Sequence, residues 1–109
     1  MDREPKVFVT TCLITMALHG NSSLKGKRSV LNRIKSRVKN RFNVSIAEVG
    51  ELQSLQKAVL GISSVSSDKV YLEGQMTKVV DFIAGISEAT LADVQTIIES
   101  KGGNDHVYL

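Results

Sequence analysis

Basic side chains are the residues of this sequence with the clearest chemical potential, because they are concentrated in one segment. From Pro5 to Ala47 the chain has nine Lys or Arg residues and no Asp or Glu, and eight of the nine lie between Lys25 and Arg41. Outside that segment, six basic residues stand against eleven acidic ones, so the net charge of +3 hides two regions of opposite charge. Segregation of this kind is typical of a protein that binds an anionic partner.

Three of these cations crowd the start of a predicted helix, which is the positive end of its dipole. Each cation there costs roughly 0.3–1 kcal/mol, whereas a phosphate would be held by free backbone N–H groups and cations together. Four more cations project on both flanks of the apolar stripe of that helix. We therefore predict a site for RNA or another anion made of Lys25, Lys27, Arg28, Arg33, Lys35, Arg37 and Lys39. The alternative is a set of solvated charges whose stems cover apolar surface.

Other residue types give little support for catalysis. Cys12 is the only cysteine and lies in an apolar run, which favours a buried structural thiol over a nucleophile. His19 has no second histidine or carboxylate at the spacing of metal ligands. Glu48 and Glu51 follow or end a predicted strand, where they can pair with the basic helix, and a catalytic pair of carboxylates is the weaker interpretation. We predict that the protein is not an enzyme and uses no cofactor or metal.

The elements that must position these side chains follow from hydrophobic periodicity. Alternating or continuous apolar runs predict four strands, at Lys6–Leu18, 43–49, 58–65 and 90–100. Apolar residues at helical spacing predict two helices, at 26–41 and Lys69–Ala84. The order β-α-β-β-α-β with right-handed crossovers predicts an α+β domain of ferredoxin-like architecture, in which two helices cover one face of a four-stranded antiparallel sheet.

Length and composition place these elements in one domain. At 109 residues the chain fits a single ferredoxin-like domain over residues 1–100, followed by a loosely ordered tail at 101–109. The N-terminus lacks the pattern of a signal peptide, and no apolar stretch approaches the roughly 20 residues of a membrane span. We expect a cytoplasmic protein without a membrane partner.

One face of the predicted sheet would carry no helix. Val7, Val9, Leu13 and Ala17 give that face an apolar character, softened by Thr11 and Thr15. Self-association is the simplest way to cover such a patch, so we expect a homo-oligomer through the open sheet face. A semi-exposed sheet without a partner is the alternative.

Three segments carry a resemblance to a known family: SLKGKRSV from Ser23, RFNVSIAEV from Arg41 and AVLG from Ala58. They resemble the YlxP-like family of small uncharacterised bacterial proteins. The resemblance implies a ferredoxin-like fold and no catalytic residues. It also implies a link to RNA, because genes of this family often lie near genes for translation and ribosome maturation. Gly50 and Leu55 depart from the family pattern, whose members tend to carry Asp and Trp there.

Two functions are therefore predicted. The first is a non-enzymatic accessory domain, associated with RNA or a ribosomal subunit, that binds the phosphate backbone through its basic helix. The second is a homo-oligomeric protein-interaction or regulatory module that works through its open sheet face.

Overall fold

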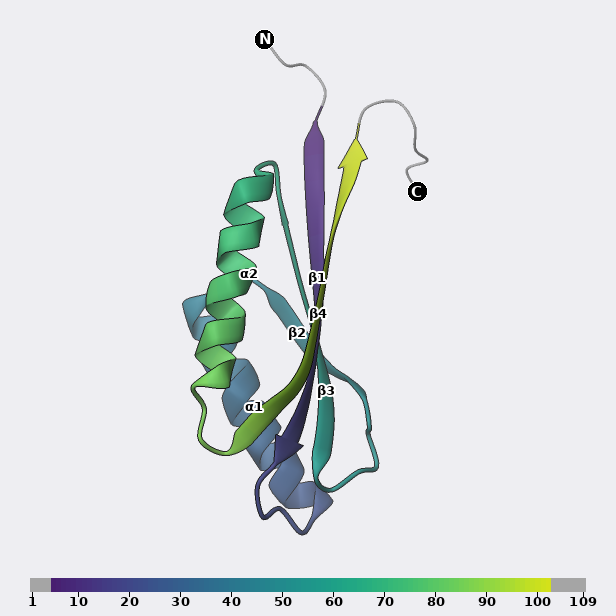
Figure 1. Ribbon diagram of the computed structural model, residues 1–109, viewed down its shortest axis with the longest axis vertical. Helices are drawn as coiled ribbons and strands as arrows, with labels where there is room; N and C mark the ends of the chain where they lie inside the picture. Colours follow the sequence, from purple (N-terminus) through teal and green to yellow (C-terminus); the bar gives the residue numbers. More distant parts are fainter. Residues whose placement is uncertain (1–4, 103–109) are drawn as a thin grey trace.

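The computed structural model describes residues 5–102 and contains six elements (Figure 1). They are β1 (Lys6–Leu18), α1 (Leu24–Arg41), β2 (Ser45–Gly50), β3 (Lys57–Ser66), α2 (Lys69–Ala84) and β4 (Ala89–Gly102). The predicted order β-α-β-β-α-β is confirmed. The bounds of β1 and α2 and the end of α1 agree with the prediction to the residue, and the other ends differ by one or two residues.

Local side-chain chemistry sets where the helices begin. Ser23 has extended backbone angles, and its Oγ accepts a hydrogen bond from the Gly26 N–H at 3.0 Å, so α1 begins at Leu24 rather than at the predicted Gly26. Asp68 caps α2 in the same way, with Oδ1 accepting from the Tyr71 N–H at 3.1 Å. Each cap satisfies a backbone donor that the helix itself leaves without a partner.

The four strands form one antiparallel sheet in the order β2-β3-β1-β4. Both helices lie against the same face of this sheet (Figure 1), so the predicted ferredoxin-like architecture is confirmed. Strands β1 and β3 are central, whereas β2 and β4 are the two edges. The end of β1 meets the segment that joins β2 to β3, because Leu18 donates its N–H to the Gln56 carbonyl at 2.8 Å.

The core lies between the sheet and the helices and is built of aliphatic side chains. Inward-facing residues of β1 and β3 pack against the buried stripes of α1 and α2. The fully buried members include Cys12, Ile14, Met16, Leu31, Ile34, Val38, Leu60, Ile62, Val79 and Ile83. Cys12 accepts a hydrogen bond from the Thr96 hydroxyl at 3.5 Å, and its burial agrees with the predicted structural role. Within residues 5–102, no helix is long and apolar enough to cross a membrane.

Strand β4 continues into the region predicted as a tail. Lys101 pairs with Val7 and Gly102 pairs with Lys6, so both belong to the sheet. The rest of the predicted tail, residues 103–109, lies outside the described residues.

The second face of the sheet carries no helix and has scattered apolar side chains. Leu13 is 40% exposed, Val65 63% and Ile97 61%. Cross-strand pairing places Val65 opposite Val9 and Ile97 opposite Thr11, so these side chains share one face. Serine and threonine residues interrupt the patch, as the sequence predicted for Thr11 and Thr15.

Candidate functional site

Helix α1 presents three surfaces with different surroundings, and the predicted basic residues are divided among them. The face toward the sheet carries Leu31, Ile34 and Val38, which are buried. Lys27 lies on this same face, one turn before Leu31, and only 2% of it is exposed. The other predicted cations lie on the two flanks of this face.

Lys27 is held by oxygen atoms of the chain itself. Its Nζ donates to the backbone carbonyl of Glu51 at 2.6 Å and to that of Ser54 at 2.8 Å. It also lies 3.0 Å from Oε2 of Glu48, with which it forms an ion pair. Two of the three N–H donors of the ammonium group thus bond to carbonyls, while the Glu48 carboxylate acts as its counter-ion without a hydrogen bond to Oε2. Lys27 therefore offers no charge to an external phosphate, which corrects its predicted place in the anion site.

The contacts around Lys27 show why the segment SLKGKRSV needs a glycine at position 26. Asn21 donates from Nδ2 to the carbonyls of Ser23, at 2.8 Å, and of Leu55, at 2.6 Å. A Cβ at Gly26 would lie 2.4 Å from Oδ1 of Asn21, so only glycine leaves room for this side chain. We call Asn21, Lys27 and Glu48 the lysine clamp. It joins the start of α1 to β2 and to the loop at 51–56.

The clamp also holds one residue in a disfavoured conformation. Glu51 has φ of 55°, the left-handed region that residues with a side chain seldom adopt. Its carbonyl accepts both from Lys27 and from the Ser54 N–H at 3.1 Å. Glu48 thus pairs with the basic helix through its carboxylate, as predicted, whereas Glu51 contacts Lys27 through its backbone carbonyl.

One flank of α1 faces α2, and its cations contact this helix and the loop that follows it. Arg33 forms an ion pair with Glu88 at 2.5 Å and donates to the Ser29 hydroxyl at 2.9 Å. The guanidinium of Arg37 lies 5.5 Å from the centre of the Phe82 ring, and that of Arg41 lies 4.8 Å from it. These contacts are cation–π interactions. Arg33 and Arg37 are therefore partly engaged within the fold.

The opposite flank carries the remaining predicted cations: Lys25, Arg28, Lys35 and Lys39. Their spacing places them along one side of the helix, away from α2. Lys35 is half-buried and the others are exposed. Within residues 5–102, none of the four side chains forms an ion pair or a hydrogen bond. We call these four residues the outer basic stripe.

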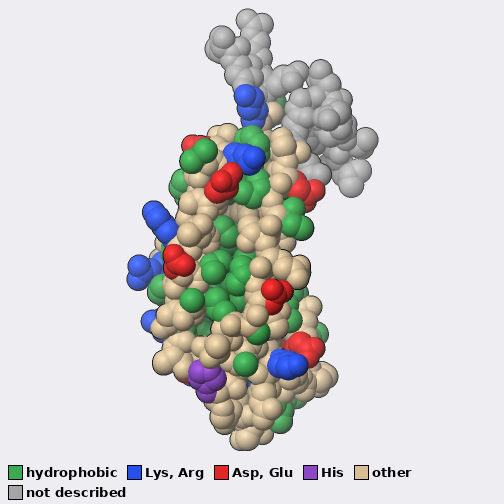
Figure 2. Space-filling view, in the orientation of Figure 1, with side chains coloured by type: hydrophobic (Ala, Val, Ile, Leu, Met, Phe, Trp, Pro, Cys, Tyr) green, Lys and Arg blue, Asp and Glu red, His purple; other side chains and the backbone are tan. Residues whose placement is uncertain are grey.

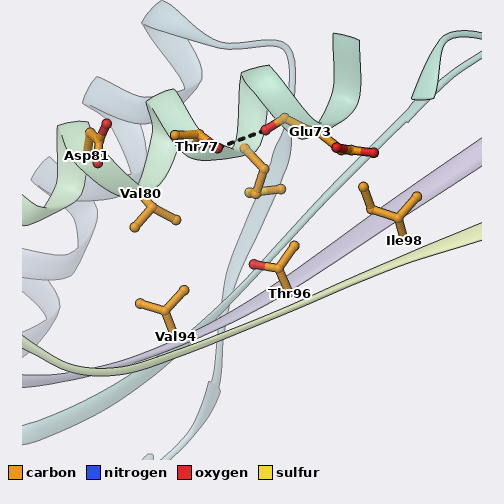
Figure 3. A pocket seen from close by; sticks show the side chains of 8 residues that line it. Glu73, Thr77, Val80, Asp81, Val94, Thr96 and Ile98 are labelled. Carbon is orange, nitrogen blue, oxygen red and sulfur yellow. Dashed lines mark hydrogen bonds between the residues drawn. The ribbon is translucent and has the colours of Figure 1, made fainter. Parts of the chain in front are cut away.

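The opposite side of the domain has a different character. A groove of about 350 Å³ lies between α2 and β4. Figure 3 shows Val80, Val94 and Ile98 turned into it, with Glu73 and Asp81 on the helix. Figure 2 shows the hydrophobic floor of this face with acidic side chains on both sides of it. Because carboxylates repel phosphate, this groove is unsuited to a nucleic-acid backbone.

His19 joins the segment after β1 to the loop after α2 and to the start of β4. Its Nδ1 lies 3.1 Å from the Ser87 carbonyl and its Nε2 lies 2.6 Å from the Thr90 hydroxyl. The carbonyl can only accept, so Nδ1 is the donor in the contact with Ser87. Among the described residues, no group of three His, Cys, Asp or Glu side chains could hold a metal ion.

A second hollow lies between the end of α1 and the first turns of α2. It measures about 590 Å³ and is lined by Arg41, Phe42, Asn43, Val70, Tyr71, Gly74, Gln75 and Lys78. None of these lining residues was predicted as part of a site. One feature of the sequence could have indicated this hollow: Gln75 is a polar residue that shares the buried stripe of α2 with Leu72 and Val79.

Comparison with known proteins identifies the family. Residues 9–96 match the family described as "Protein of unknown function (DUF503)". The chain belongs to this family. The uncharacterized protein YlxP of Bacillus subtilis strain 168 is 44% identical over 71 residues, which are 65% of this chain and 77% of that protein. The predicted resemblance is thus confirmed.

A solved structure supports the fold of this DUF503 member. The de novo designed protein Foldit4 superposes with a TM-score of 0.52 at 16% identity, covering 86% of this chain and 98% of the designed one. At that identity the likeness shows a shared fold alone. The region matched to the family includes the lysine clamp, the outer basic stripe and the hollow between α1 and α2.

Proposed function

We propose that this protein is a cytoplasmic, non-enzymatic accessory domain, associated with RNA or a ribosomal subunit, that binds the phosphate backbone. The observation that carries the proposal is the outer basic stripe. Lys25, Arg28, Lys35 and Lys39 line one side of α1, and no acidic group of the described chain neutralises them. Cations held without intramolecular partners are available to phosphate oxygens.

The length of the stripe suits a nucleic-acid strand. Fourteen residues separate Lys25 from Lys39, and a rise of 1.5 Å per residue makes the stripe about 21 Å long. Four cations over that length can contact several successive phosphates without reading a base. Such contacts fix position and supply affinity, so binding should depend little on RNA sequence.

The first experiment measures RNA binding as salt is varied, because each neutralised phosphate releases counterions. For single-stranded RNA and four contacts, the logarithm of the association constant should fall with the logarithm of salt with a slope of roughly −3. The variant Lys35→Gln/Lys39→Gln removes two contacts, so the slope should become shallower by roughly 1.4. Absence of binding by the parent at about 50 mM salt would contradict the proposal.

The open sheet face favours a second function, a homo-oligomeric protein-interaction module. Leu13, Val65 and Ile97 leave apolar surface in water on the face without helices. A second copy of the chain is the occupant that this proposal names. Sedimentation of the parent at high micromolar concentration should then show a dimer or larger species, and Val65→Asp should shift it toward the monomer. A monomeric parent would rule this function out.

A further inference from the structure

The hollow between the end of α1 and the start of α2 has the properties of a small-molecule site. Its volume of about 590 Å³ is within the usual range for ligand pockets, roughly 300–1,000 Å³. Its lining combines two cations, two aromatic rings and two amides, and none of the described residues that line it is acidic. A ligand that fits it should therefore be anionic, with a flat polar ring.

Gly74 leaves bare helix backbone on the wall of this pocket. It lies in the interior of α2, where glycine is less favourable than alanine. A Cβ built at this position meets no atom within 4 Å, so packing does not require the glycine. The absent side chain allows a bound molecule to approach the helix closely.

Gln75, the next residue, has an incomplete set of hydrogen bonds. Only 8% of it is exposed, and its Nε2 donates to the Tyr71 hydroxyl at 3.3 Å. Its Oε1 is buried and has no partner. Rotation of the terminal amide can turn this oxygen toward the pocket, because that torsion is broad. A glutamine amide offers one acceptor and two donors, which match the amino group and a ring nitrogen of adenine.

The remaining side chains provide a ring and a charge. Tyr71 is 53% exposed at the pocket, where its ring can stack on a base. Arg41 is oriented by its contact with Phe82, and Lys78 lies one turn after Gly74 on α2. Together these two cations can hold a phosphate group.

We propose that this pocket binds an adenine nucleotide, either free or as an unpaired residue of RNA. The base stacks on Tyr71 and pairs with the Gln75 amide, the sugar lies against Gly74, and the phosphate contacts Arg41 and Lys78. The pocket shares no residue with the outer basic stripe, so this inference is independent of backbone binding by α1.

The experiment is a titration of the full chain followed by NMR, with AMP, CMP, adenosine and a short oligoadenylate as probes. We expect AMP to bind with a dissociation constant below about 1 mM, at least about fivefold tighter than CMP and adenosine. Binding of oligoadenylate that is stronger than that of AMP and is weakened by Gly74→Ala identifies RNA as the source of the base, because Gly74 is not part of the outer basic stripe. Equal binding identifies the free nucleotide. If neither AMP nor oligoadenylate binds at millimolar concentration, the proposal is overturned, whatever the salt titration of RNA binding shows.

Substitutions of glycine test the pocket without removing a contact. Gly74→Ala should raise the melting temperature by a few degrees and weaken AMP binding at least about tenfold, because the methyl group fills the wall. Gly85→Ala is the matched control, since its Cβ would make only ordinary contacts at the other end of α2. It should leave AMP affinity unchanged. Equal AMP affinity of Gly74→Ala and the parent would overturn the proposal.

Two further variants test the recognition of the base and of the phosphate separately. Gln75→Leu should remove the preference for AMP over CMP, while the fold is retained because leucine suits the buried stripe. Lys78→Gln should bring AMP affinity close to that of adenosine and leave adenosine binding unchanged. A preference for AMP over CMP that survives in Gln75→Leu would contradict the assigned role of the amide.

Discussion

Lys27 and Arg28 are neighbours in sequence and have opposite surroundings. Lys27 is buried under the first turn of α1, where two carbonyls and one carboxylate surround its ammonium. Arg28 is exposed on the outer basic stripe and has no partner within the described chain. The same helix therefore uses one cation to hold the fold and leaves others available to a partner. In a cluster of basic residues, the cations that pair within the fold should be separated from the exposed ones before the cluster is called a binding site.

The largest effect is expected from loss of the buried cation. Lys27→Met leaves the carboxylate of Glu48 without its counter-ion and two carbonyls without their donor, which should reduce the free energy of unfolding by about 3 kcal/mol. This corresponds to a melting temperature lower by roughly 10–20 °C. Urea unfolding measures the change. Lys39→Met, on the outer stripe, is the matched control and should change stability by less than about 0.5 kcal/mol. Similar losses in both variants would remove the distinction between the two regions.

A smaller loss of stability is expected from Asn21, the second residue of the lysine clamp that bonds to the loop at 51–56. Asn21→Ala removes two hydrogen bonds, to the Ser23 and Leu55 carbonyls, and should cost about 1–2 kcal/mol. Thermal unfolding by circular dichroism gives the change. Asn40→Ala, exposed on α1, should be neutral or slightly stabilising, because alanine favours a helix. A neutral Asn21→Ala would show that the loop at 51–56 is not held by the clamp.

The smallest effect on stability is expected at the flank that faces α2. Arg33 is 54% exposed and its partner Glu88 is 38% exposed, so water screens their attraction. A double-mutant cycle with Arg33→Ala and Glu88→Ala should give a coupling energy of about 0.5 kcal/mol or less. A coupling above about 1.5 kcal/mol would place Arg33 with Lys27 among the cations that hold the fold.

Periodicity was sufficient to predict most of the fold. The bounds of α2 followed from the spacing of Leu72, Met76, Val79 and Ile83 together with the Asp68 cap, and those of β1 from its long β-branched run. The start of α1 was predicted two residues late because Ser23 was not recognised as the cap. Local signals of this kind act within a few residues, which is why a single sequence reveals them.

The division of the basic residues could not be predicted with the same ease, because it depends on distant partners. Lys27 bonds to carbonyls 24 and 27 residues away, and Arg33 pairs with Glu88 at a separation of 55. One signal was present: Lys27 shares helical spacing with Leu31, Ile34 and Val38, and therefore lies on the buried stripe. The hollow near Gln75 likewise forms only when α1 and α2 come together.

The measurement that tests the central claim most directly compares RNA affinity and stability between a charge-reversal variant of the outer basic stripe and a control variant. Arg28→Glu/Lys39→Glu places two acids on the outer basic stripe, and Lys57→Glu reverses an exposed cation on β3, away from it. The account predicts that at about 50 mM salt the double variant binds single-stranded RNA at least about tenfold more weakly than the parent. It also predicts that the free energy of unfolding changes by less than about 0.5 kcal/mol, and that Lys57→Glu stays close to the parent in both. RNA affinity that is equal in the parent and the double variant would contradict the account.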